Sequence, residues 1–195
     1  MMTVIMKPNL GIDIGRVIIH GDGPDTSFIG ATDEDSLKAP PIEGAFEAIG
    51  HLVPLFDGHV WLVSKCGPRI AERSLRWLDH HRFWEATGVA RERVRFCRQR
   101  REKAEICLDL GIGWFVDDRL DVLVPMEGIV PHRFLFGASH ATDPSVYPVP
   151  TWTAAEAGIR ATRDEWEALD PSARLHSGSG RTSSHRDTDP PLARR

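Results

Sequence analysis

Short apolar runs alternate with segments of helical periodicity as far as residue 169, and this alternation is the strongest constraint on the fold. The runs are rich in Val, Ile, Phe and Trp, a composition typical of buried strands. They cover Leu10–Ile14, Val60–Val63, Val94–Cys97, Trp114–Val116 and Arg133–Phe136. Strands and helices in alternation predict a three-layer α/β domain, with a parallel sheet of about five strands and helices on both faces.

The segments between these runs carry apolar stripes at helical spacing. In the first segment, Ala45, Ile49, Leu52 and Phe56 share one face, and Pro54 predicts that the helix ends or kinks there. The other predicted helices cover residues 68–78, residues 104–111 and Ala154–Leu169.

The last 26 residues differ in composition from the rest of the chain. From Asp170 the sequence reads DPSARLHSGSGRTSSHRDTDPPLARR, with almost no large apolar residues. Such a segment cannot bury enough surface to offset the entropy lost on ordering, so we expect disorder. The predicted organisation is one α/β domain over residues 1–169 and a disordered tail over residues 170–195.

Charge and cysteine content exclude several classes of protein. The 195 residues include 24 Lys and Arg against 28 Asp and Glu, a formal net charge of −4, so an overall basic footprint for nucleic acid is absent. Three cysteines do not suggest a disulfide framework. The apolar start is broken by Lys7, Pro8 and Asn9, and no run has the length of a membrane helix. We expect a cytoplasmic protein without a membrane partner; the sequence leaves the oligomeric state open.

Polar residues end three of the predicted strands. Asp13 ends the first, Ser64 and Lys65 the second, and Asp117 and Asp118 the fourth. In a parallel α/β sheet, ligands bind at the carboxyl ends of the strands. Buried carboxylates repel one another unless a cation lies among them, and hard oxygen ligands suit Mg²⁺. The sequence therefore predicts a magnesium site at this edge of the sheet.

The same edge has the groups that a phosphate ligand needs. Lys103 begins the helix that leads into the fourth strand, and its ammonium would lie beside the hydroxyl of Ser64. Both groups bind phosphate oxygens. The carboxylate of Asp13 can act as a nucleophile and form an aspartyl phosphate.

Four motifs in this order resemble the haloacid dehalogenase (HAD) superfamily of phosphohydrolases. They are LGIDIG with Asp13, WLVSK with Ser64, REKAEI with Lys103, and WFVDDR with Asp117 and Asp118. The resemblance covers about residues 9–137 and implies a Rossmann-like HAD fold. The run PPIEGAFEAI…VWLVSK…RWLDHH…FVDD is similar to the 5′-nucleotidase branch, which acts on nucleoside monophosphates.

The resemblance implies roles for the metal ligands. Asp13 would be both the nucleophile and a Mg²⁺ ligand, the carbonyl of Gly15 a second ligand and Asp118 a third. Asp117 would support the site or share the metal. Mg²⁺ is therefore the expected cofactor.

It also implies roles for the residues that hold the phosphoryl group. Ser64 would hydrogen-bond the phosphoryl group, and Lys103 would neutralise it and orient Asp13. Lys65 and Arg98 are further candidates for substrate binding. Arg98 belongs to an arginine-rich run, Arg91–Lys103, which is either a solvated strand edge or an anion-attracting rim, with Arg98, Gln99, Arg100 and Arg101 as the best candidates for the rim.

One position departs from the family pattern. The phosphatase branches carry a second Asp two residues after the nucleophile, and this sequence has Gly15 there. That Asp protonates the leaving oxygen, help worth about 10²–10⁴-fold in rate. Three interpretations stay open: a leaving group that needs no proton, replacement by His20 or Asp22, or a protein that binds a phosphorylated ligand with little or no turnover.

The segment after the first strand is short. Residues 16–40 are too few for a helical cap domain, and we expect a β-hairpin flap around Gly21–Pro24, with Val17–Ile19 leading into it. The expected site is open.

The favoured function is a Mg²⁺-dependent phosphohydrolase acting on a small phosphomonoester, with a nucleotide as one candidate. The alternatives are a phosphate- or nucleotide-binding protein of low or no activity, and an end-processing phosphatase on nucleic acid.

Overall fold

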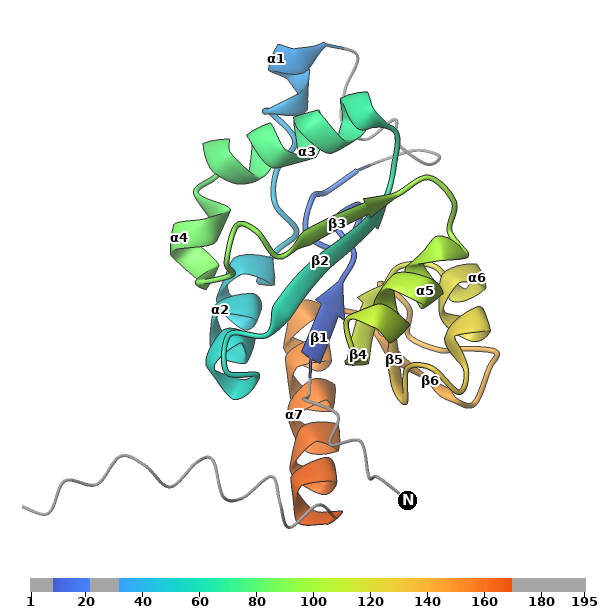
Figure 1. The fold of residues 1–195 in the computed structure, drawn as a ribbon. Coiled ribbons are helices and arrows are strands. Elements are labelled where there is room, and N and C mark those ends of the chain that lie inside the picture. Colours follow the sequence, from blue (N-terminus) through green and yellow to red (C-terminus); the bar gives the residue numbers. More distant parts are fainter. Residues whose placement is uncertain (1–8, 22–31, 170–195) are drawn as a thin grey trace, which may run out of the picture. The chain divides into compact units, whose positions relative to one another are not determined.

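The computed structural model describes residues 9–21 and 32–169 (Figure 1). Within them, six strands form one parallel sheet in the order β3-β2-β1-β4-β5-β6. The strands are β1 Asn9–Ile12, β2 Val60–Lys65, β3 Val94–Cys97, β4 Ile112–Asp117, β5 His132–Phe136 and β6 Val146–Val149. The predicted α/β class with a parallel, Rossmann-like sheet is confirmed.

Seven α-helices and one 3₁₀ turn (η2) connect the strands in the described residues. They are α1 Asp33–Ser36, α2 Ala45–Leu55, α3 Pro68–His80, α4 Phe83–Thr87, α5 Glu102–Asp109, α6 Leu120–Leu123, η2 Val124–Met126 and α7 Trp152–Leu169. Helix α2 ends one residue after Pro54, as predicted. None of these helices has the length and hydropathy needed to cross a bilayer.

The sixth strand was not predicted. Strand β6 reads VYPV, in which an exposed Tyr147 and Pro148 interrupt the apolar pattern between buried Val146 and Val149. The strand pairs with β5 alone and lies at the sheet edge, where proline is tolerated because no second ladder needs its missing N–H group.

Two layers of helices cover the sheet within residues 9–161. On one face, α5 and α6 pack over buried side chains of the central strands such as Val63, Phe115 and Leu135 (Figure 1). Helix α2 lies on the opposite face, where Phe46 makes edge-to-face contacts with Trp77 of α3 and Phe83 of α4. These contacts fix the helices that follow β2 and β4, so the carboxyl ends of the strands are held in place.

A tight turn follows β1. The carbonyl oxygen of Ile14 accepts hydrogen bonds from the N–H groups of Ile18 and Ile19, which closes one helical turn. Val17, Ile18 and Ile19 are fully buried, and the indole of Trp152 donates to the Val17 carbonyl at 2.7 Å. The turn therefore anchors the backbone immediately after Asp13.

The predicted flap and tail fall mainly outside the described residues. Gly21 is described, whereas the rest of the expected hairpin tip, 22–24, is not, and the same holds for the tail 170–195. Between 32 and 40 the structure has the four-residue helix α1. The chain divides into two compact units, Met1–Ala161 and Thr162–Arg195, and the described part of the second is the end of α7. The expected domain boundary at residue 169 stays a prediction.

Candidate functional site

Asp13, Ser64 and Asp117 lie at the carboxyl ends of three adjacent strands, with Asp13 directly after β1. Strand β1 lies between β2 and β4, and Ile12 is paired with Leu62 on one side and Val116 on the other. The next residues along each strand therefore end at one level. The N–H group of Asp13 donates to the Val116 carbonyl at 2.9 Å, which holds the carboxylate beside β4. The structure therefore brings these strand-end residues together at one edge of the sheet, as the sequence predicts.

Lys103 connects two of the carboxylates. Its Nζ atom lies 2.9 Å from Oδ1 of Asp13 and 2.7 Å from Oδ2 of Asp117, and the lysine is only 2% exposed. Burial alone would lower the pKa of Lys103, but the charges of Asp117 and Asp13 outweigh it and raise the pKa above its usual value. Lys103 is therefore a fixed positive charge in the site.

The loop before α5 is held by its own helix. The Glu102 side chain accepts hydrogen bonds from the backbone N–H groups of Arg98 and Gln99, at 2.9 and 3.2 Å. Arg98 and Gln99 precede the helix, so this glutamate satisfies N–H groups of the loop that leads into α5. This positions Lys103 one residue later.

Three carboxylates meet at the ends of β1 and β4. Asp13, Asp117 and Asp118 each place one oxygen within 4.8 Å of the other two. Burial raises the pKa of Asp117 to about 7, against the lowering effect of Lys103, and burial followed by the charge of Asp13 raises the pKa of Asp118. Raised pKa values mean that the site disfavours this concentration of negative charge. Three oxygen donors with excess negative charge fit a divalent cation such as Mg²⁺.

Gly15 lines the same pocket as Asp13 and Asp118. The Gly15–Ile19 bridge uses hydrogen bonds from Arg16 N to the Ile19 carbonyl and from Ile19 N to the Ile14 carbonyl. Neither bond uses the Gly15 carbonyl oxygen, which leaves it suited to the predicted role of a backbone metal ligand.

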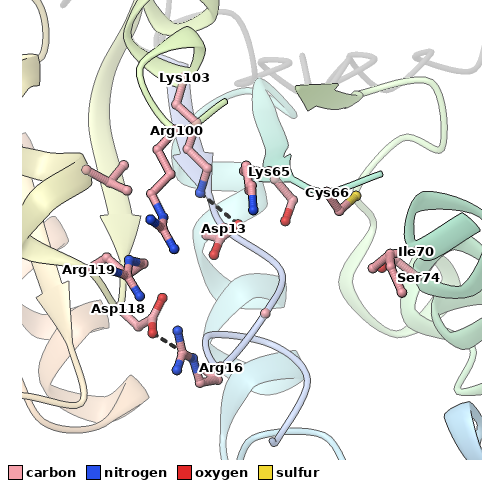
Figure 2. A pocket seen from close by; sticks show the side chains of 13 residues that line it. Asp13, Arg16, Lys65, Cys66, Ile70, Ser74, Arg100, Lys103, Asp118 and Arg119 are labelled. Carbon is pink, nitrogen blue, oxygen red and sulfur yellow. Dashed lines mark ion pairs between the residues drawn. The ribbon is translucent and has the colours of Figure 1, made fainter. Parts of the chain in front are cut away.

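A pocket opens over these groups (Figure 2). Its walls come from the ends of β1, β2 and β4, the first turns of α3 and the loop before α5. The lining residues are Asp13, Gly15, Arg16, Ser64, Lys65, Cys66, Ile70, Ser74, Arg100, Lys103, Asp118, Arg119 and Val122. Asp117 lies behind the pocket and is fully buried.

Several predicted site residues lie elsewhere. Arg98 is exposed and is not among the residues that line the pocket, whereas Arg100 of the same run is. His20, a candidate replacement acid, is exposed and also not part of the lining, and Asp22 lies outside the described residues.

Cys66 lines the pocket, but burial, with the charge of Asp13, raises the pKa of its thiol to about 11. The thiol is therefore expected to be protonated and unreactive near neutral pH.

Sequence reasoning missed Arg16, Arg119, Ile70 and Ser74. The two arginines directly follow the predicted metal ligands Gly15 and Asp118 in the sequence. This adjacency could have marked them as pocket residues. Ile70 and Ser74 lie in the first turns of the helix that follows β2, and only the packing of that helix brings them to the pocket.

Comparisons with known proteins give a match at the level of structure. No protein-family model matches the sequence, and no curated protein matches it significantly. Among solved structures, the fold is similar to that of a haloacid dehalogenase-like family hydrolase from Xanthomonas campestris, with a TM-score of 0.55 and 13% identity. The match covers 84% of this chain and 98% of the hydrolase. At this identity the likeness shows a shared fold.

Proposed function

We propose that the protein is a Mg²⁺-dependent phosphohydrolase that cleaves a small phosphomonoester through an aspartyl phosphate on Asp13. The observation that carries this proposal is the arrangement of Asp13: it faces a pocket with Ser64, is ion-paired with Lys103 and lies within 4.8 Å of two further carboxylates. The HAD-like fold of the Xanthomonas hydrolase supports it.

Asp13 would attack the phosphorus with one carboxylate oxygen while Lys103 orients the other. The new O–P bond forms as the bond to the leaving oxygen breaks, and the leaving oxygen takes a proton from water if it needs one. A water molecule then attacks the phosphorus of the aspartyl phosphate, the Asp13 carboxylate is released and the water proton goes to solvent.

The other residues would stabilise charge on the phosphoryl oxygens. Ser64 donates a hydrogen bond from its hydroxyl, and Lys65 and Lys103 supply positive charge. Asp13, Asp118 and the Gly15 carbonyl would hold Mg²⁺, with Asp117 in support, and the bound ion would neutralise phosphate charge and shield the attacking carboxylate from it.

Gly15 supports a second candidate, a phosphate-binding protein with little or no turnover. Gly15 lines the pocket and has no side chain with which to protonate a leaving group. His20, the described candidate for that role, does not line it. A substrate whose leaving group needs no proton would still react, so the two candidates differ in what they hydrolyse.

The test compares p-nitrophenyl phosphate, which has an acidic leaving group, with ethyl phosphate, which does not. The enzyme proposal expects Mg²⁺-dependent turnover of the first, none with Asp13→Asn, and a phosphorylated Asp13 peptide after acid quenching. Asp109→Asn, an exposed change of the same kind outside the pocket, is the matched control. No turnover of either ester, with phosphate binding that Ser64→Ala abolishes, would instead favour the binding protein. Nucleoside monophosphates test the proposed nucleotidase likeness in the same assay.

A further inference from the structure

One wall of the pocket carries two arginines from separate segments. Arg100 lies in the loop before α5, and Arg119 follows Asp118 at the start of α6. Figure 2 shows both on the same side of Asp13 as Asp118. Their side chains are about one third exposed, 32% and 33%, so they are partly buried and still reachable from the pocket.

The two arginines converge on one exposed carboxylate. Arg119 Nε lies 2.8 Å from Oδ1 of Asp121, and Arg100 Nη1 lies 3.7 Å from Oδ2 of the same side chain. The backbone N–H of Arg119 also donates to Oδ1 of Asp117 at 3.0 Å, which fixes the backbone position of this arginine. Arg119 Nη2 also donates to Oδ2 of Asp121, at 3.1 Å, so Asp121 holds the two guanidinium groups close together.

The lining residues that come from α3 are uncharged, and the nearest cation on that side of Asp13 in Figure 2 is Lys65 of β2. Figure 2 shows Ile70 and Ser74 of α3 on the far side of the pocket from Arg100 and Arg119. An anionic group that extends from the phosphoryl site would therefore be attracted to the arginine wall and not to α3.

The charge balance of the pocket allows more than one anionic group. Five cationic side chains line it, and four carboxylates lie among them or behind them. A bound divalent cation would add two positive charges. A phosphomonoester carries at most about two negative charges near neutral pH, fewer than the five cationic side chains that line the pocket. The charged residues are Arg16, Lys65, Arg100, Lys103 and Arg119, against Asp13, Asp117, Asp118 and Asp121.

We propose that Arg100 and Arg119 form a second anion subsite, and that the substrate is an organic phosphate with a second anionic group, either a carboxylate or another phosphate. Guanidinium groups bind both kinds of anion in a bidentate manner. The identity of the first group rests on the proposed function, whereas the subsite rests on the two arginines.

The test measures binding, by calorimetry with Mg²⁺ present, of three phosphonates that are not hydrolysed. Propylphosphonate has one anionic group, 3-phosphonopropionate adds a carboxylate, and propane-1,3-diylbisphosphonate adds a second phosphonate. We expect at least one of the two ligands with a second anionic group to bind roughly 10-fold more tightly than propylphosphonate. The ligand with the larger gain in affinity over propylphosphonate identifies the second anionic group of the substrate.

Variants locate the subsite. In the double variant Arg100→Gln, Arg119→Gln, ligands with a second anionic group should no longer bind more tightly than propylphosphonate. The affinity for propylphosphonate should stay within about 3-fold of wild type. Each single variant should lose part of the preference, which keeps the test valid if the double variant folds poorly by circular dichroism. Arg95→Gln, an equal loss of charge in the same arginine-rich run but outside the pocket, should keep it.

The outcomes separate this inference from the proposed function. Equal binding of all three ligands to the wild-type protein, or a preference unchanged in the double variant, overturns the second subsite and leaves the phosphoryl site intact. Failure of all three to bind overturns both.

Discussion

Arg16 is ion-paired with Asp118, with 2.8 Å between Nε and Oδ2. The arginine has a φ of +58°, a left-handed conformation that is uncommon for any residue with a side chain. A positively charged side chain therefore contacts Asp118, one of the two carboxylates proposed as metal ligands. The turn after β1 holds Arg16 beside Asp118, because the N–H group of Arg16 also donates to the Ile19 carbonyl at 2.9 Å.

Replacement of this arginine should tighten metal binding. Arg16 and Mg²⁺ would compete for the Asp118 carboxylate, and a partly buried ion pair is worth about 1 kcal/mol, or several-fold in affinity. We expect Arg16→Gln to lower the Mg²⁺ dissociation constant about 3–10-fold in calorimetry without phosphate. Arg95→Gln, which lies outside the pocket, should leave it unchanged. Weaker binding by Arg16→Gln would mean that the arginine supports the site and does not compete.

A carboxylate at residue 15 should restore hydrolysis of esters with poor leaving groups. Gly15 lines the pocket and is not among the glycines with positive φ, so its backbone accepts a side chain. We expect Gly15→Asp to raise kcat/KM for ethyl phosphate about 10²–10⁴-fold, with a smaller gain for p-nitrophenyl phosphate. Gly15→Ala controls for the added bulk. Equal gains for the two esters would show that leaving-group protonation was not the missing element.

The cysteines should be unreactive and should make stability fall at alkaline pH. Burial raises the pKa to about 11 for Cys66 and Cys97 and to about 12 for Cys107, above the usual thiol value of 9.0. Between about pH 9 and 11 the unfolded chain loses thiol protons that the folded chain keeps, so the free energy of unfolding decreases as pH rises.

Two measurements check the thiols. Labelling by a thiol reagent at pH 8 should be slow in the native protein and fast in urea. The urea midpoint should be lower at pH 10.5 than at pH 8, and cysteine-to-alanine changes should reduce that difference. Rapid labelling of the native protein would contradict the burial of all three cysteines in the structure.

Gly11 should not tolerate a methyl group, whereas Gly113 on the adjacent strand should. A Cβ atom at Gly11 would lie 2.5 Å from Cδ2 of Phe115, whereas one at Gly113 would have no neighbour within 4 Å. We expect Gly11→Ala to reduce the free energy of unfolding by about 1–3 kcal/mol. Gly113→Ala should have little effect or stabilise the protein slightly, because the unfolded chain loses entropy. Urea unfolding of both variants measures the difference; equal losses would mean that backbone effects, and not the Phe115 contact, decide the result.

Much of the fold could be predicted from local pattern. Strand β4 is buried throughout and contains the predicted run Trp114–Val116, and α3, predicted over residues 68–78, covers Pro68–His80. Strand β6 could not be predicted, because an edge strand needs only its two buried valines and is stabilised by pairing with β5, a contact between segments. The alternation of runs says that a parallel sheet forms, but not how many edge strands join it.

The candidate ligands Asp13, Asp117 and Asp118 could be predicted from the sequence. Residues at the carboxyl ends of adjacent parallel strands lie close together, whatever path the connecting loops take. Side chains on the loops and helices around them were not. Arg98 and Arg100 are two residues apart in the same run, yet only Arg100 lines the pocket. The hydrophobic pattern along the chain predicts which segments form strands, whereas the direction of a loop side chain is decided by the packing of α3, α5 and α6 against the sheet. Only the tertiary structure sets that packing, because it arises from contacts between residues far apart in the chain.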